Sequence, residues 1–137
     1  MPLVVDASVV ACWILADESD PVADAALARI DFDPIVAPSL WWWETRNLLI
    51  VAERRGRLEP AKTAEALRLL ADCPLTFDAD ADEEALLQLA RRRGLTVYDA
   101  AYLELALRLR CPLATLDRGL ADAARAEGAS LIGEGGI

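Results

Sequence analysis

Two aspartates of this chain each follow directly after a short apolar run, Asp6 in LVVDAS and Asp117 in PLATLD. Two further acids, Glu44 and Asp99, lie in the first turns of segments with a helical pattern. In open α/β sheets, ligands bind beyond the carboxyl ends of the strands, and the helices that follow those strands begin at the same rim. We therefore expect all four acids to lie at one rim of a sheet. Carboxylate oxygens, without histidine or cysteine ligands, select hard cations such as Mg²⁺ or Mn²⁺.

The composition leaves few other kinds of chemistry. The 137-residue chain has no histidine and a single lysine, Lys62. These absences exclude histidine acid–base catalysis, Ser/His/Asp and Cys/His nucleophiles, His-ligated zinc and Walker-type phosphate binding. The net charge of −9 argues against tight nonspecific binding to nucleic acid. It does not argue against a protein whose acids hold Mg²⁺ between themselves and a phosphate.

Each acid also has a purely structural interpretation. Asp6 and Asp117 could be helix N-caps, and Asp99 could complete a capping box with Thr96. Glu44 could favour a helix N-terminus through the helix dipole. For any single acid, capping is the more common explanation. For the four together the balance reverses, because acids that converge on one rim repel one another unless they are protonated or bind metal.

The elements that would position these acids follow from the pattern of apolar residues. We expect one domain, residues 1–137, because the chain has no repeat, low-complexity tract or linker. Short apolar runs alternate with helical patterns, which is typical of a parallel sheet covered by helices on both faces. The predicted strands span residues 3–5, 35–37, 75–77, 112–115 and 130–132.

Helix boundaries are indicated by capping residues, proline and glycine. Asp20 followed by Pro21 opens a helix to about residue 30, and Pro60 opens another to residue 71. Asp80 with Glu83 resembles a capping box for a helix that ends at residue 93, before a glycine. The other predicted helices span 39–55, 96–110 and 118–127.

Four segments carry a family resemblance. In this order and spacing, VVDASV, APSL followed by WWWETRNLL, GLTVYDAAYLELA and PLATLDRGLA resemble a PIN domain of the VapC type over nearly the whole chain. Each segment alone is a weak signal, whereas the four together are specific. The resemblance implies a three-layer α/β/α sandwich with a parallel sheet of order 3-2-1-4-5. It also implies a metal-dependent endoribonuclease, the toxin of a type II toxin–antitoxin pair.

The resemblance assigns roles to the acids. The family's quartet falls on Asp6, Glu44, Asp99 and Asp117. The implied reaction is phosphodiester hydrolysis in RNA by a water that one or two Mg²⁺ or Mn²⁺ ions activate, leaving a 5′-phosphate and a 3′-hydroxyl. Asp6, Asp99 and Asp117 are expected to be the main metal ligands. Glu44 is expected to act through a bound water or a second ion.

Further residues match the family's motifs around the acids. Its frequent asparagine, one turn after the glutamate, falls on Asn47, and its hydroxyl residue before the last acid falls on Thr115. Both are expected to support the metal ligands from behind, and Ser8 also matches the first motif. The arginines at 54–55 and 91–93 are interpreted as helix C-caps before glycine, with contact to RNA phosphates as the alternative.

The high content of hydrophobic residues indicates that the protein binds partners. The hydrophobic share of 55% exceeds that of an ordinary soluble domain, which favours surface covered by a partner. Trp41, Trp42 and Trp43 stand where the family commonly has aliphatic residues, and three successive helix residues span too wide an arc to share one narrow face. We expect an RNA substrate, a homodimer and a small antitoxin. The tryptophans would serve one of the two protein interfaces or, alternatively, stack on RNA bases.

The location is expected to be cytoplasmic. No run approaches the roughly 18 uncharged apolar residues of a spanning helix. The N-terminus meets an acid at Asp6 and has no basic leader, unlike a signal peptide. The three cysteines are odd in number and widely spaced, which favours buried thiols over a disulfide or zinc site.

Two other functions remain open. A phosphoacceptor or phosphatase-type Mg²⁺-binding α/β domain would need a second acid beside Asp6, where Ala7 and Ser8 stand, and a lysine late in the chain rather than at Lys62. A catalytically inactive PIN-like module would only bind a partner. Nothing in the sequence supports this second alternative, because all four acids are present, and an activity assay separates it from a nuclease.

Overall fold

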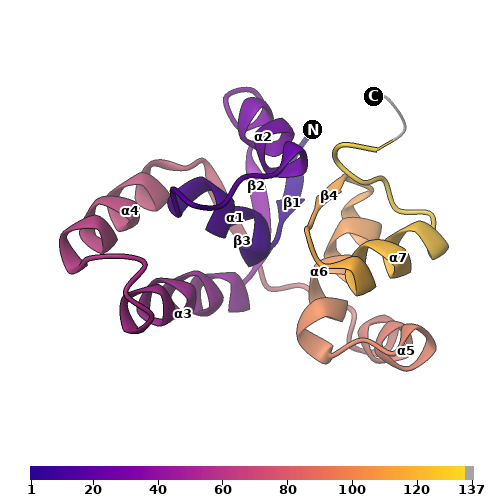
Figure 1. Cartoon of the computed structure of the whole chain (residues 1–137). Coiled ribbons are helices and arrows are strands. Elements are labelled where there is room, and N and C mark those ends of the chain that lie inside the picture. Colours follow the sequence, from indigo (N-terminus) through magenta and orange to yellow (C-terminus); the bar gives the residue numbers. More distant parts are fainter. Residues whose placement is uncertain (135–137) are drawn as a thin grey trace.

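The structure, a computed structural model, describes residues 1–134, in which strands alternate with helices as predicted (Figure 1). The last three residues of the predicted 1–137 domain lie outside the described part of the chain. In chain order the elements are β1 (Leu3–Val5), α1 (Ala7–Ile14), α2 (Pro21–Arg29), β2 (Ile35–Pro38), α3 (Leu40–Arg54), α4 (Pro60–Asp72), β3 (Leu75–Asp78), α5 (Glu83–Arg93), α6 (Val97–Leu109), β4 (Leu113–Ala114) and α7 (Arg118–Ala126).

A parallel sheet with the strand order β3-β2-β1-β4 forms the centre of the molecule. In its register Leu3 lies opposite Ile35 of β2, and Val5 lies opposite Ala114 of β4. All residues of β1 and β4 are buried, as expected for strands that helices cover on both faces. The predicted α/β class and the order of the first four strands are confirmed, and β1 lies between β2 and β4.

The fifth predicted strand, at 130–132, is reduced to a single parallel bridge between Leu131 and Leu113. The backbone of Leu113 exchanges two hydrogen bonds with this segment, each of 2.9 Å. The bridge lies beside β4, where the order 3-2-1-4-5 places a fifth strand. It is short because β4 begins only after Pro112, which has no N–H to donate, and because the chain turns at Gly133 with a φ of +86°.

Helices pack on the sheet in two groups (Figure 1). Helix α6 contacts β1, β2 and β4, and α5 and α7 pack against α6. The helices α1, α2 and α3 form the second group, in which α2 contacts β4 and α3 contacts β2. Helices α3 and α4 extend from this group as a helical hairpin, seen at the left of Figure 1. No helix within residues 1–134 is long and apolar enough to cross a membrane.

Most predicted helix starts are confirmed by their caps. The Asp20 carboxylate accepts a hydrogen bond from the backbone of Val22 at 2.8 Å, and Pro21 opens α2. Pro60 opens α4, and the Thr96 hydroxyl caps α6. Each of these contacts is local, which is why the sequence alone indicates it.

Helix α5 starts differently from the prediction. Its N-cap is Asp82, whose carboxylate accepts a hydrogen bond from Ala85 N at 3.1 Å, rather than Asp80. The backbone N–H of Asp80 instead donates to Asp78 Oδ1 at 2.9 Å, which holds this residue in a turn after β3. The helix therefore begins two residues later than the Asp80 cap would allow.

Candidate active site

Asp6 is the buried centre of the candidate site. It follows the last residue of β1 and is the N-cap of α1, so its backbone joins the middle of the sheet to a helix N-terminus. One carboxylate oxygen, Oδ1, accepts hydrogen bonds from Ser8 Oγ at 2.5 Å and from Val9 N at 3.3 Å. Burial raises the pKa of Asp6, and the hydrogen bonds from Ser8 and Thr115 offset only part of that effect. The capping interpretation of Asp6 is therefore correct, and it is compatible with a chemical role.

Two hydroxyl groups join the ends of β1 and β4. Thr115, the residue after β4, donates its hydroxyl hydrogen to Asp6 Oδ2 and accepts a hydrogen bond from Asp117 N at 3.0 Å. Ser8 donates to Asp6 and accepts from Leu116 N at 3.0 Å. The loop after β4 is thereby held against the first turn of α1. Thr115 therefore contacts Asp6 directly.

Asp117 lies on the same rim and caps α7. Its Oδ1 accepts a hydrogen bond from Leu120 N at 2.9 Å. A Cβ added at Gly119 would lie 3.3 Å from this same oxygen, so a glycine leaves room for the carboxylate. In residues 1–134 no hydrogen bond reaches the second oxygen, Oδ2. Asp117 can therefore cap its helix through one oxygen and offer the other to a ligand.

Glu44 and Asp99 approach from two different helices. Glu44 lies in α3 and is half-buried, and its Oε1 accepts a hydrogen bond from the hydroxyl of Tyr102 in α6 at 2.5 Å. Asp99 lies in the first turn of α6, where its backbone N–H donates to Thr96 Oγ1 at 3.1 Å. The Glu44 carboxylate is therefore bonded to α6, and the charge of Asp99, in the same helix, also acts on it.

The negative charges of Asp6, Asp99 and Asp117 affect the pKa values of Glu44 and Asp99. Burial raises the pKa of Glu44, and the charges of Asp6 and Asp99 raise it further. Burial also raises the pKa of Asp99, and the charge of Asp117 adds to this. The negative charge that raises the pKa values of Glu44 and Asp99 is of the kind that a bound cation would offset.

The donor set fits a hard divalent cation. Its members offer carboxylate oxygens, with hydroxyl groups behind them, which is the ligand chemistry of Mg²⁺ and Mn²⁺. Within the described residues, no three acidic, histidine or cysteine side chains stand close enough together to form a ready-made metal cage. Mutual repulsion opposes such an approach, and the charge of a bound cation would remove that repulsion.

Two residues of the site region differ in how well the sequence indicated them. Asn47 is exposed on α3, and no hydrogen bond among residues 1–134 ties it to the acids. Tyr102, in contrast, was not predicted as a site residue. Tyr98 is 64% exposed, whereas Tyr102 is 1% exposed and bonds to Glu44. The sequence did offer one signal for a site residue here, a tyrosine three residues after Asp99 and therefore on the same face of the helix.

The tryptophan run divides between core and surface, as its spacing predicted. Trp41 is 1% exposed and packs edge-on against Phe77 of β3, with ring centroids 6.2 Å apart. Trp42 and Trp43 are 41% and 70% exposed and contact one another. Arg46 lies over the Trp42 ring, 4.5 Å from its centroid. Trp42 and Trp43 therefore form an exposed aromatic pair on α3.

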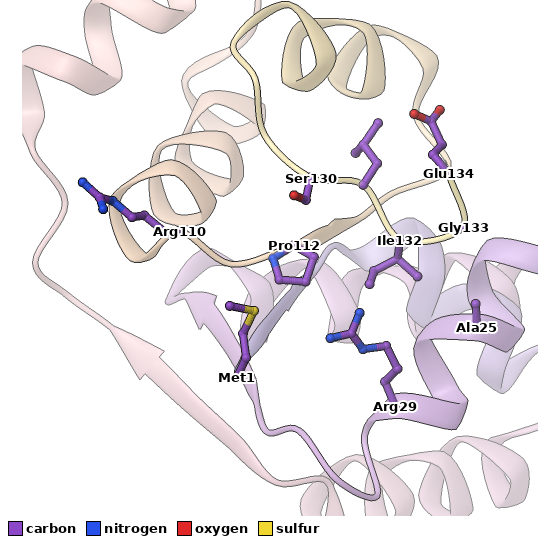
Figure 2. Close-up of a pocket in the computed structure, with 10 residues that line it drawn as sticks. Met1, Ala25, Arg29, Arg110, Pro112, Ser130, Ile132, Gly133 and Glu134 are labelled. Atoms are coloured by element: carbon purple, nitrogen blue, oxygen red, sulfur yellow. The ribbon is translucent and has the colours of Figure 1, made fainter. Parts of the chain in front are cut away.

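A cavity of about 570 Å³ is lined by Met1, Arg29, Arg110, Pro112 and residues 130–134, among others (Figure 2). Met1 and Pro112, which line it, precede β1 and β4, so the cavity is at the amino ends of these strands. In Figure 2 the side chain of Arg110 extends away from that of Arg29, so the two cations do not converge on a common ligand position. This cavity therefore does not belong to the acidic site. Lys62 lies on α4, where it pairs with Glu65.

The fold and the rim of acids define a class of protein. The sheet is parallel, and its strand β1 ends in a buried aspartate. Residues 3–126 of the chain match the family described as the PIN domain. This match covers most of the sequence. The chain belongs to the PIN-domain family.

Individual relatives agree with this membership. The chain is 35% identical over 130 residues to Ribonuclease VapC3 of Pyrobaculum aerophilum, covering 89% of this chain and 94% of that protein. Its structure is similar to the crystal structure of PAE2754 from Pyrobaculum aerophilum, with a TM-score of 0.70 and 26% identity over 96% of this chain and 92% of the other. VapC20 of Mycobacterium tuberculosis, named as a sarcin-ricin loop cleaving toxin, shares the fold, with a TM-score of 0.59 and 19% identity over 88% and 94% of the two chains.

Proposed function

We propose that this protein is a Mg²⁺-dependent endoribonuclease and the toxin of a VapBC-type toxin–antitoxin pair, with Mn²⁺ as an alternative ion. The observation that carries the proposal is the buried Asp6 carboxylate, held by Ser8 and Thr115 at the end of the central strand beside three further acids. The similarity to Ribonuclease VapC3 supports RNA as the substrate. We also propose that residues 1–137 form a single PIN domain.

Asp6, Asp99 and Asp117 would hold the metal, with Glu44 at its edge. A bound divalent ion lowers the pKa of a coordinated water and neutralises charge on the phosphate. Ser8 and Thr115 orient Asp6 through its two oxygens, so that the carboxylate cannot rotate away from the rim. Asn47, one turn after Glu44, is exposed and would support the metal ligands from behind.

RNA cleavage with and without metal tests this function. We expect the purified protein to cleave RNA with Mg²⁺ or Mn²⁺ in zinc-free buffer, and excess EDTA to stop the reaction. Asp99→Asn should abolish cleavage, whereas Asp24→Asn, which changes an exposed acid of α2, should leave it unchanged. Full-rate cleavage in EDTA would contradict the metal mechanism. No cleavage of any RNA with either ion would favour an inactive PIN-like binding module.

We further propose that the protein is cytoplasmic, forms a homodimer and binds a small antitoxin. The exposed Trp42 and Trp43 offer aromatic area that one helix does not bury, which favours a protein interface. The acidic rim is a natural position for an arginine of the antitoxin, which would block metal binding or substrate entry. Light scattering at micromolar concentration, and a pull-down from the host, test the dimer and the antitoxin separately.

A further inference from the structure

Tyr102 joins two parts of the candidate site that come from different helices. Its ring lies in the hydrophobic core and is 1% exposed, and its hydroxyl donates to Glu44 Oε1 at 2.5 Å. The two residues are 58 positions apart in sequence. In residues 1–134 this is the hydrogen bond that links the side chains of α3 and α6.

We propose that Tyr102 is a positioning residue for the metal centre, which sets where the Glu44 carboxylate stands relative to Asp99. The proposal rests on the function proposed above. Asp99 and Tyr102 are three residues apart in α6 and therefore lie on one face of that helix. A single helix turn thus supplies one acid of the site directly and holds another in place through the phenol.

Glu44 needs such a restraint more than the other acids do. Asp6 and Asp117 have short side chains, and each is fixed by a hydrogen bond from the backbone of the helix that it caps. Glu44 has a longer side chain with more rotatable bonds and does not cap its helix. Its carboxylate is half-buried, next to the charges of Asp6 and Asp99, which repel it. Without the Tyr102 hydroxyl, repulsion would favour a rotamer that points away from the site.

The geometry leaves Glu44 free to act. Tyr102 occupies only Oε1, and no hydrogen bond within the described chain reaches Oε2. A phenol keeps its hydrogen near neutral pH, so the Tyr102 hydroxyl can donate to the carboxylate. The donor is also rigid, because the ring is fully buried in the hydrophobic core.

Metal affinity measured by calorimetry, with Mn²⁺ as the probe and no RNA present, tests the proposal on the full chain. Tyr102→Phe keeps the buried ring and removes only the hydroxyl. We expect the Kd for Mn²⁺ to rise about 10-fold, the lower end for loss of a group that orients a metal ligand. Tyr98→Phe removes an exposed hydroxyl one turn earlier in the same helix and should leave the Kd unchanged.

A double-mutant cycle separates positioning from a merely structural role. If Tyr102 acts through Glu44, Tyr102→Phe should cause no further loss of Mn²⁺ affinity in a Glu44→Ala background. The same 10-fold loss in that background, or wild-type affinity in the single Tyr102→Phe variant, would overturn the proposal. Should Tyr102→Phe fail to fold, Glu44→Asp decides: it keeps the charge and the tyrosine but draws the carboxylate back by one methylene. Weaker Mn²⁺ binding by Glu44→Asp supports the positioning role, and unchanged binding rejects it.

The outcomes also distinguish this inference from the proposed function. A wild-type protein that neither binds Mn²⁺ nor cleaves RNA overturns both. A wild-type protein that does both, together with a Tyr102→Phe variant of equal affinity and equal cleavage rate, overturns only the role of Tyr102.

Discussion

The hydroxyl of Thr115, directly after β4, donates a hydrogen bond to Asp6 Oδ2, directly after β1, although 109 residues separate the two. Both groups are buried, Asp6 at 6% and Thr115 at 7% exposure. A buried carboxylate that loses a donor keeps its desolvation cost without compensation. The Thr115 hydroxyl therefore stabilises both the candidate site and the contact between the two strand ends.

Thr115→Val, which keeps the shape of the side chain and removes the hydroxyl, should destabilise the protein by about 2 kcal/mol. Urea unfolding at neutral pH without metal measures this. Thr76→Val, on the exposed edge strand β3, is the control and should change the unfolding free energy by less than about 0.5 kcal/mol. If both variants have the wild-type stability, the hydrogen bond to Asp6 contributes nothing to the fold.

Asp6→Asn should abolish metal-dependent cleavage without unfolding the metal-free protein. Burial raises the pKa of Asp6 in the folded protein above the ordinary value of an aspartate, so the folded state holds this proton more tightly than the unfolded state does. This group contributes its full stabilisation at a pH below the pKa that it has in the unfolded state. The stabilisation is lost as the pH rises through the pKa that the group has in the folded state. In EDTA, the unfolding free energy of Asp6→Asn relative to wild type should therefore increase between about pH 3 and about pH 7.

Asp78→Asn provides a control of opposite sign for this pH series. The guanidinium of Arg108 lowers the pKa of Asp78, so its stabilisation is present above the unfolded pKa and is lost as pH falls. Its unfolding free energy relative to wild type should decrease over the same pH range. An Asp6→Asn variant that unfolds at every pH would instead mean that capping α1 is the main role of Asp6.

Arg108 holds the far end of α6 and should matter for stability more than an exposed arginine does. Its guanidinium bonds to Glu104 Oε2 and to Asp78 Oδ1, each at 2.8 Å, and Glu104 is 4% exposed. Arg108→Leu leaves the Glu104 charge buried without a cation and should cost about 3 kcal/mol in thermal or urea unfolding. Arg125→Leu removes a more exposed pair with Asp122 and should cost less than about 1 kcal/mol. Equal effects of the two substitutions would contradict this difference.

The tryptophans should separate into a core residue and a surface residue. Trp41→Ala removes a fully buried indole and should destabilise the monomer by about 3–5 kcal/mol in urea unfolding. Trp41→Phe should cost less, because the Trp41 N–H has no hydrogen-bond partner among residues 1–134. Trp43→Ala should change monomer stability by less than about 0.5 kcal/mol and weaken self-association in light scattering. A Trp43→Ala variant that unfolds, or that associates as wild type does, would reject the interface assigned to this residue.

Local features of the chain were predictable from the sequence alone. Asp20 and Pro21 at the start of α2, and the Thr96 cap of α6, involve neighbours two or three residues away, so residue type and spacing are sufficient. The same holds for the apolar strands β1 and β2, in which every residue except Pro38 is buried. Since parallel strands all end at one rim, the position of Asp6 and Asp117 on that rim also followed from the sequence.

Tertiary packing decided what depends on distant residues. The bonds from Thr115 to Asp6 and from Tyr102 to Glu44 span 109 and 58 positions, and no local pattern distinguishes a tyrosine that packs from one that also bonds to a carboxylate. Similarly, only the packing of α3 on β2 and β3 shows that Trp41 points inward while Trp43 points outward. A helix supplies the spacing of its side chains from its own geometry, but the face that it buries is set by the elements against which it packs.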